Sequence, residues 1–478
     1  MKTNKVNLAY VSFLSVVAAI GGFLFGYDTA VISGTITQVG LRFDLDAMQT
    51  GWYVGCALVG SIIGVLFAGI LSDAIGRKHT MLLSAFLFSL SALGCAISDT
   101  YEQLVLFRII GGIGIGVVSI ISPLYISEVS VAEYRGRLVS LYQVAVTVGF
   151  LGAYLINYAL LEFSLSNNPS GIGLWDRVFV SEVWRGMLGM EVIPALIFFI
   201  IIFFIPESPR WLILKNRNNS AIDILERIYG NMKEATSQLN QTRNVISTEQ
   251  KSEWKLLLKP GILKSVLVGM SIAILGQFMG VNAVLYYGPT IFQESGLSNG
   301  DSLFFQVFVG SVNMLTAILA LLIIDKIGRK KLVYYGVSGM IVSLLLIGTY
   351  FMAGEGLGIS PVALLVFILA YVFFCAISIC AVIWVLLSEM YPIRVRGLAM
   401  SLAGLALWVG TYLIGQLTPW LLENLNAGNT FFLFALMCIP YLYIIWKHVP
   451  DTTGRSLEEI EKMWEPEKKI NEIETENI

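Results

Sequence analysis

Long apolar runs separated by short polar connections make up most of this 478-residue chain. A helix that crosses a lipid bilayer needs about 20 mostly apolar residues. The segments that meet this requirement are 8–37, 51–72, 79–98, 101–126, 138–161, 184–205, 261–292, 303–324, 331–353, 361–388, 397–422 and 429–448. The pattern therefore predicts an all-α membrane protein with twelve transmembrane helices.

Lys and Arg are concentrated in alternate connections between these segments. Of the 31 such residues, only Arg42, Arg177 and Arg185 fall on the opposite side, and Arg108 lies inside a segment. Positively charged connections remain on the cytoplasmic side of a membrane. The bias predicts a multi-pass protein of the cell (inner) membrane with both termini in the cytoplasm.

The two halves of the chain repeat a short motif. Asp73-Ala-Ile-Gly-Arg-Lys78 joins the second and third segments, and Asp325-Lys-Ile-Gly-Arg-Lys330 joins the eighth and ninth. Such symmetry is typical of carriers in which two six-helix bundles, related by a pseudo-two-fold axis, rock about a central site. The expected domains are an N-terminal bundle (1–205), a cytoplasmic linker (206–260), a C-terminal bundle (261–448) and a cytoplasmic tail (449–478).

The polar linker contains one clear helix signal. Asn219-Ser220 precedes Ala221–Tyr229, and Gly230 follows. A polar cap before an amphipathic run and a glycine after it predict a short capped helix.

The composition argues against soluble and catalytic functions. Only 13% of the residues are charged, against about 25% in soluble domains. The chain has only two histidines, and both lie at segment ends. Few residues are therefore suited to a metal site or to a histidine-based catalytic triad. We expect no enzyme, no metal or organic cofactor and no nucleic-acid partner. The five cysteines lie in apolar runs without metal spacing, and we expect apolar fillers without a disulfide: Cys56, Cys95, Cys375, Cys380 and Cys438.

One carboxylate interrupts the first apolar run. Asp28 stands in Gly26-Tyr27-Asp28, and Arg108 opens a second apolar run. Ionisable groups inside a membrane are costly unless they have a partner or a function. Burial raises the pKa of such a carboxyl and a nearby guanidinium lowers it. We therefore hypothesise that Asp28 binds and releases a proton as its distance from Arg108 changes; the alternative is a static ion pair that holds two helices together.

Several motifs identify a family. They are Gly26-Tyr27-Asp28, Asp73…Gly76-Arg77-Lys78, Arg108-Ile-Ile-Gly-Gly-Ile-Gly, Glu128…Arg135-Gly136-Arg137, Pro206-Glu207-Ser208-Pro209-Arg210-Trp211-Leu212, Gln277-Phe-Met-Gly-Val-Asn282, Leu285-Tyr286-Tyr287 and Pro450-Asp-Thr-Thr-Gly454-Arg455. Over about residues 8–466 the chain resembles the sugar porters of the major facilitator superfamily, and most closely the bacterial xylose–proton symporters among them. The resemblance implies the major facilitator fold, with the proton as coupling ion.

Functional residues follow from this resemblance position by position. Glu191 is expected to modulate the proton relay of Asp28 and Arg108. Flat aromatic faces and amides that both donate and accept suit a sugar ring. The implied sugar-binding residues are Gln143, Gln277, Asn282, Asn313, Trp384 and Trp408, with Phe25 and Tyr287 lining or gating the cavity. For any single amide the alternative is a contact between helices.

Charged residues of the cytoplasmic connections are expected to form a latch between the bundles. They are Asp73, Arg77, Glu128 and Arg135 in the first half, and Asp325, Arg329, Glu389 and Arg396 in the second. Ion pairs between the bundles favour the outward-facing state and loosen when the carrier opens inward. The alternative is that these residues only determine topology and helix ends.

Four positions depart from the pattern of the xylose carriers. Gly276, Cys380, Leu407 and Phe150 each replace a polar partner or narrow the cavity. An unpartnered sugar hydroxyl costs about 1–3 kcal/mol. The expected function is proton-coupled symport of a pentose or hexose by a monomer that alternates between two states, with a less hydroxylated, smaller or differently posed substrate than xylose as a further option. The alternatives are proton-independent uniport and, less favoured, a sugar sensor that does not transport.

Overall fold

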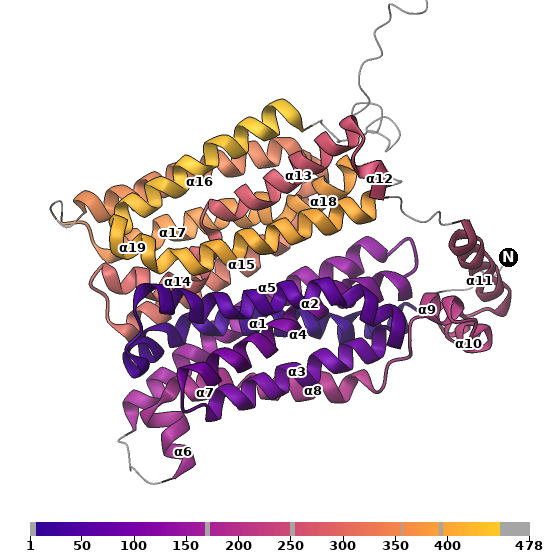
Figure 1. Ribbon diagram of the computed structural model, residues 1–478, viewed down its shortest axis with the longest axis horizontal. Helices are drawn as coiled ribbons and strands as arrows, with labels where there is room; N and C mark the ends of the chain where they lie inside the picture. The colour runs from indigo at the N-terminus through magenta and orange to yellow at the C-terminus, as the bar shows by residue number, and fades with distance from the viewer. Residues whose placement is uncertain are drawn as a thin grey trace, which may run out of the picture.

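The computed structural model describes residues 6–167, 173–248, 254–354, 356, 358–391 and 395–449. Long helices run side by side in two halves that pack lengthwise on each other (Figure 1). The tail motif that begins at Pro450 lies outside the described residues.

The N-terminal half is a bundle of long helices followed by shorter pieces. Their lengths follow from the apolar runs, and polar residues begin several of them. Asp46 and Gln49, for example, form a reciprocal capping box at the start of α2. The elements are α1 (Leu8–Phe43), α2 (Ala47–Ile75), α3 (Arg77–Ile97), α4 (Tyr101–Val129), α5 (Arg135–Ser166), α6 (Leu174–Asp176), η1 (Arg177–Ser181), α7 (Val183–Gly189) and α8 (Val192–Ile202).

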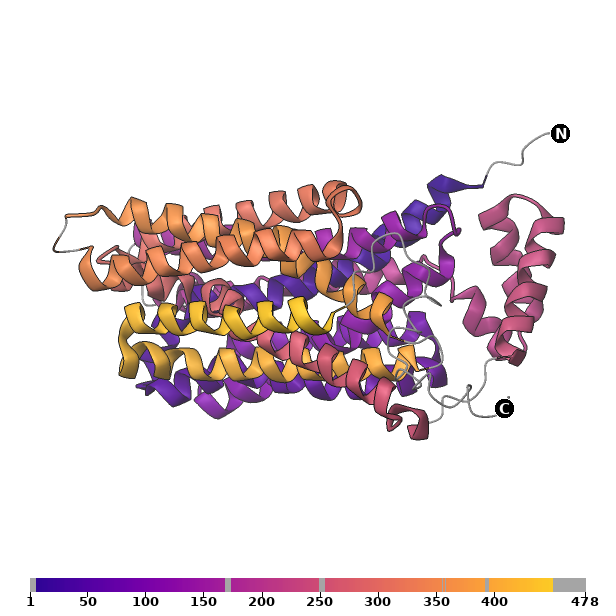
Figure 2. The ribbon, with the colours of Figure 1, turned by 90° about the horizontal axis from the view of Figure 1, so that it is seen from above.

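Four short helices follow. They are α9 (Pro209–Leu214), α10 (Asn218–Tyr229), α11 (Met232–Thr248) and α12 (Trp254–Leu257). The predicted linker helix is α10, which ends at Gly230 in the left-handed conformation with φ 66°. Its start differs from the prediction, because it begins at Asn218 without a side-chain cap. Figures 1 and 2 both place α9–α11 beyond one end of the bundles, which we call the linker end; the opposite end is the far end.

The C-terminal half repeats the bundle. Its elements are α13 (Pro260–Phe278), α14 (Val281–Glu294), α15 (Asn299–Ile327), α16 (Arg329–Ala353), α17 (Pro361–Cys375), η2 (Ala376–Cys380), α18 (Ala381–Met390) and α19 (Arg396–His448). Eleven helical segments of the described chain are long and apolar enough to cross a membrane. The last of these is interrupted by Asn426, whose backbone is not helical, so it provides two crossings. The structure thus agrees with twelve spans.

Several spans that the apolar pattern predicts as unbroken helices are interrupted. The sixth breaks at Met190 and Glu191, and the seventh at Met279 and Gly280. The tenth contains the π turn η2. Apolar runs of membrane length have no polar face that would mark such breaks, and freed backbone groups are satisfied by neighbouring helices.

The halves contact each other mainly towards the far end. Three hydrogen bonds between described residues join them: the Thr37 hydroxyl donates to Gln293, Tyr154 to the Leu285 carbonyl and the Gln416 amide to the Met48 carbonyl. At Gly51 an added Cβ would lie 2.0 Å from the Gln416 carbonyl oxygen, so α2 and α19 touch through their backbones. These contacts close the far end.

Candidate functional site

Asp28 and Arg108 meet in the interior of the N-terminal half. Asp28 Oδ1 accepts a hydrogen bond from Arg108 Nη1, and both terminal guanidinium nitrogens lie 3.4 Å from the Asp28 carbonyl oxygen. The residues are 0% and 2% exposed. Asp28 Oδ2 and Arg108 Nε have no hydrogen-bond partner among the described residues. The pair is therefore tightly buried and keeps one oxygen free to receive a proton.

Gly111 makes this arrangement possible. A Cβ at this position would lie 2.9 Å from Asp28 Oδ2 and 2.5 Å from Ser91 Oγ. Only glycine lets the α4 backbone approach the carboxylate so closely. The glycines that follow also let helices pack closely, because a Cβ at Gly112 or Gly116 would clash with the backbone of α2.

Glu191 is a third ionisable group in this interior. It lies at the break between α7 and α8, is 2% exposed, and its Oε1 has no hydrogen-bond partner among the described residues. It is close enough to Asp28 and Arg108 to interact electrostatically with both. A cavity of about 10 Å³, lined by Arg108, Thr29 and Tyr286 among others, lies beside the pair. It has room for about one water molecule and reaches α14 of the other half.

An amide cluster occupies the interior of the C-terminal half. Gln277 Oε1 accepts a hydrogen bond from Asn282 Nδ2 at 2.7 Å and lies 3.1 Å from the Thr411 hydroxyl. The break between α13 and α14 places the two amides together, since Gly280 has φ +88° there. Thr411 could not be predicted as part of this cluster, because a hydroxyl in an apolar helix commonly bonds to its own backbone, as Thr411 also does to the Leu407 carbonyl.

The remaining predicted sugar residues are distributed around this cluster. Phe25 of α1 and Trp408 of α19 face each other across the halves, with ring centroids 5.8 Å apart. The buried Tyr287 donates to the Gly415 carbonyl at 2.6 Å. Gln143 and Trp384 are exposed, and Asn313 is buried. The side chains of these three residues form no hydrogen bond with another described residue. Their sugar-binding role stays a prediction.

At the linker end, each half contains an ion pair between two of its own charged residues. In the N-terminal half, Arg77 binds Glu128 through two bonds of 3.0 Å and Asp73 through one of 3.0 Å. In the C-terminal half, Arg329 Nη2 lies 3.3 Å from Glu389 Oε1. The other predicted latch arginines are Arg135, which is exposed, and Arg396, whose Nη2 lies 3.4 Å from the Tyr391 carbonyl oxygen. The Asp325 side chain lies outside the described residues. A latch between the halves stays a prediction.

The Pro-Glu-Ser-Pro-Arg motif joins the linker to the N-terminal half. The Glu207 carboxylate accepts hydrogen bonds from the backbone nitrogens of Arg77 and Lys78, at the start of α3. A carboxylate stabilises the positive end of a helix. Ser208 caps α9 and donates to Glu128. Through these hydrogen bonds the motif connects the linker to the start of α3 and to the Arg77–Glu128 ion pair.

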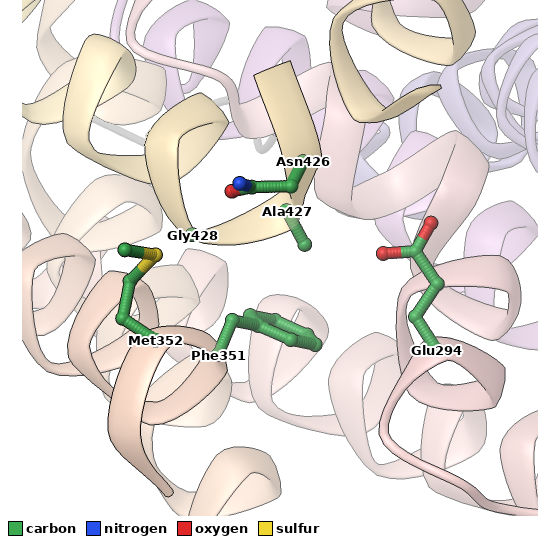
Figure 3. A pocket seen from close by; sticks show the side chains of 6 residues that line it. All are labelled: Glu294, Phe351, Met352, Asn426, Ala427 and Gly428. Atoms are coloured by element: carbon green, nitrogen blue, oxygen red, sulfur yellow. The ribbon is translucent and has the colours of Figure 1, made fainter. Parts of the chain in front are cut away.

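A cavity of about 380 Å³ lies elsewhere, at the far end of the C-terminal half. Its lining residues come from the ends of α14 and α16 and from the break in α19: Glu294, Phe351, Met352, Asn426, Ala427 and Gly428 (Figure 3). None of the predicted site residues lines it. It is separate from the amide cluster and from the Asp28–Arg108 pair.

Comparisons with known proteins agree with this geometry. Residues 14–464 match the family described as "Sugar (and other) transporter". The arabinose-proton symporter of Bacillus subtilis (strain 168) is 36% identical over 462 residues, covering 97% of each chain. The D-xylose-proton symporter of Escherichia coli (strain K12) is 35% identical over 498 residues, covering 97% of this chain and 98% of the relative.

Two solved structures extend the comparison. The inward-open conformation of the xylose transporter XylE from E. coli has a TM-score of 0.82 at 32% identity, over 95% of this chain and 100% of that one. The proton:xylose symporter XylE bound to 6-bromo-6-deoxy-D-glucose has a TM-score of 0.77 at 33% identity, over 96% of this chain and 100% of that one.

Proposed function

The chain belongs to the sugar (and other) transporter family of the major facilitator superfamily, and on this premise we propose that it carries a monosaccharide across the cell membrane together with a proton. The observation that carries the proposal is the buried Asp28–Arg108 pair with its free carboxylate oxygen. Two of its relatives are named as proton symporters of arabinose and of xylose.

Proton binding changes the energy of this pair. When Asp28 takes up a proton on Oδ2, its charge is lost and Arg108 is no longer held by an ion pair. A buried guanidinium without its counter-ion is costly, so Arg108 moves towards another acceptor, and the free oxygen of Glu191 offers one. Protonation thereby favours one arrangement of α1 and α4 over another, which is how a coupling ion shifts a conformational equilibrium.

The sugar binds between the halves, against the amide cluster. Gln277 and Asn282 provide donors and acceptors, and Trp408 with Phe25 provides aromatic faces from both halves. Gln143, Asn313, Trp384 and Tyr287 complete the proposed site. The chain has no side chain at Gly276, where a Cβ would make only ordinary contacts of 3.7 Å with Ile379 and Tyr441. A sugar that lacks or turns away one hydroxyl fits this change.

The linker end is the cytoplasmic end in this proposal. The proposed division is a bundle over 1–205, a linker over 206–260, a bundle over 261–448 and a tail over 449–478, with both termini in the cytoplasm and a monomer as the functional unit. Contacts between the halves at the far end support an inward-facing state. The higher TM-score against the inward-open relative agrees with it.

Reconstitution in liposomes tests the proposal. Ligand-induced thermal shifts across pentoses, hexoses and polyols first identify the sugar. An inward proton gradient then drives its accumulation above the external concentration, and sugar addition makes the external buffer more alkaline. Equilibration without accumulation or proton movement favours a uniporter. Binding without any flux favours a sensor, and both results contradict the proposed symport.

A further inference from the structure

Two cysteine side chains meet in the tenth span, outside the residues that the proposed mechanism uses. The sulfur atoms of Cys375 and Cys380 lie 3.7 Å apart. Cys375 is buried and Cys380 is partly exposed, and all five cysteines of the chain are free thiols. The two thiols are thus in contact, and one of them is accessible to a small reagent.

The π turn η2 explains the contact. Each residue of an α-helix turns by about 100°, so side chains five positions apart point about 140° away from each other. A π turn is wider, because its backbone hydrogen bonds join residue i to residue i+5. Cys375 directly precedes η2 and Cys380 is its last residue. The wider turn therefore brings the second thiol over the first.

The turn is held between other helices near the proposed sugar site. A Cβ built at Gly336 of α16 would lie 2.1 Å from Ser378 Cβ, so α16 packs its backbone directly on η2. Ile379 of η2 faces α13 at Gly276, next to Gln277, where an added Cβ would lie 3.7 Å from its side chain. Trp384 follows Cys380 by four residues and lies on the same face of the helix. A change in the shape of η2 is thereby passed to the residues that surround the sugar.

We propose that Cys375 and Cys380 form a redox-active dithiol, and that its oxidation to a disulfide arrests the carrier. The arrest rests on the proposed transport function, whereas formation of the disulfide does not. Bonded sulfurs lie about 2 Å apart, so closure draws the two ends of η2 together and fixes a turn that must adapt when the halves rock. In a reducing cytoplasm the pair rests as two thiols.

The chemistry is a two-electron oxidation that balances with a diazene such as diamide. The Cys380 thiolate adds to the nitrogen–nitrogen double bond. The Cys375 sulfur then attacks the Cys380 sulfur, forms the sulfur–sulfur bond and displaces the reduced reagent as a hydrazine. The hydrazine carries the two protons that the thiols lose. Attack by a thiolate on sulfur is the ordinary route of thiol exchange.

Counting thiols tests the site directly. Purified protein is treated with diamide, denatured and alkylated, and the alkyl groups are counted by mass spectrometry. We expect the wild type and the matched control Cys438→Ser, which changes a buried thiol of α19, each to lose two alkylation sites. Cys375→Ser should lose none. The same loss in Cys375→Ser, or none in the wild type, overturns the proposal.

A second reagent covers the case in which Cys375→Ser does not fold. The trivalent arsenic of phenylarsine oxide bonds to two adjacent thiols and releases one water molecule. We expect one arsenic per wild-type molecule, removed by dithiothreitol and retained in an excess of a monothiol. Absence of bound arsenic in folded wild-type protein overturns the proposal.

Transport tests the arrest. Diamide should slow sugar uptake by wild type and Cys438→Ser by at least about tenfold, as expected when a rate-limiting conformational step is blocked, and dithiothreitol should restore it. Uptake by Cys375→Ser should not respond. A disulfide that forms without slowing uptake overturns the arrest, whereas a protein that loses its thiols but never transports sugar points to failure of the proposed function instead.

Discussion

The two halves share a repeat at the linker end but differ in their interiors. The N-terminal half buries a charged pair, Asp28 with Arg108, whereas the C-terminal half holds a neutral cluster in which the partly exposed Gln277 and Asn282 meet the buried Thr411. Charge suits a proton, and amides suit hydroxyl groups. In the proposed mechanism, the proton chemistry therefore lies in one half and most of the sugar chemistry in the other, so a movement between the halves affects both.

The ion pairs of the two repeated motifs differ in how deeply they are buried. The side chains of Arg77 and Glu128 are 6% and 3% exposed, whereas those of Arg329 and Glu389 are 18% and 22% exposed. The difference has a physical source, because the linker supplies Ser208 to Glu128. The same sequence motif thus gives a more deeply buried ion pair where another segment covers it.

Removing the charge of Asp28 should have the largest effect. Asp28→Asn keeps the shape of the side chain but cannot lose a proton, so a proton gradient can no longer drive sugar uptake. We expect inside and outside sugar concentrations to become equal, while exchange of labelled for unlabelled sugar continues. Uptake and counterflow in liposomes measure this.

The matched control is Asp223→Asn, which neutralises an exposed carboxylate of α10. It should accumulate sugar like the wild type. Undiminished uphill accumulation in Asp28→Asn would exclude this carboxylate as the coupling group.

The second-largest effect is expected from breaking the buried Arg77–Glu128 ion pair, which should lower stability. Glu128→Gln leaves the buried Arg77 with only the exposed Asp73 as a carboxylate partner, and the loss of the buried pair should cost about 3 kcal/mol. Glu389→Gln is the matched change in the other half, where the partners are more exposed and we expect about 1 kcal/mol or less. Thermal unfolding in detergent compares the two variants. Equal shifts in melting temperature would show that the two ion pairs stabilise the protein to the same extent, against this prediction.

Disturbing the amide cluster should weaken sugar binding. Gln277→Ala removes a polar group that bonds to Asn282 and, in the proposed site, to the sugar. Its loss should cost about 1–3 kcal/mol, or roughly fivefold to 150-fold in affinity. Gln238→Ala, in the linker helix α11, is the control and should bind normally. Titration with the sugar found by the thermal-shift screen gives both affinities. An unchanged affinity in Gln277→Ala would move the sugar site away from this cluster.

The spans and the charged pair could be predicted because membrane physics leaves few alternatives. An apolar run of sufficient length becomes a helix, and Asp28 and Arg108 are charges in such runs that need each other. The breaks could not be predicted. Gly280 gives no sign in the sequence that it adopts a positive φ rather than a helical one. The π turn before Ala381 packs against α16, a distant part of the chain that local sequence does not reveal.

Contacts made by common residue types also escaped prediction. Thr411 reads as an ordinary helical residue until the break in the seventh span brings Gln277 towards it. Glu207 belongs to a motif of the family, yet its role at the start of α3 depends on how the linker folds back. Roles that depend on distant parts of the chain meeting cannot be read from spacing along it.

The far end has a charge cluster of its own, centred on Glu182, for which we expect a smaller effect on stability than for the ion pair at the linker end. Glu182 accepts hydrogen bonds from Arg185 at 2.5 Å, Arg42 at 2.7 Å and Arg177 at 3.1 Å. Burial alone would raise the pKa of Glu182, but the hydrogen bonds from Arg185 and Arg177 outweigh it and hold this pKa below its usual range. The carboxylate therefore ties the end of α1 to η1 and α7.

This shift predicts how stability depends on pH. The folded-state pKa of Glu182 is lower than that of the unfolded chain, so its contribution is complete above the ordinary glutamate pKa of about 4.3 and is lost as pH falls through the lower folded value. Glu182→Gln should flatten this part of the acid-unfolding profile and lower stability slightly at neutral pH. Glu162→Gln, an exposed change at the same end, should leave the profile intact. If both variants unfold in acid like the wild type, Glu182 does not stabilise the far end, and its contacts there are replaceable by water.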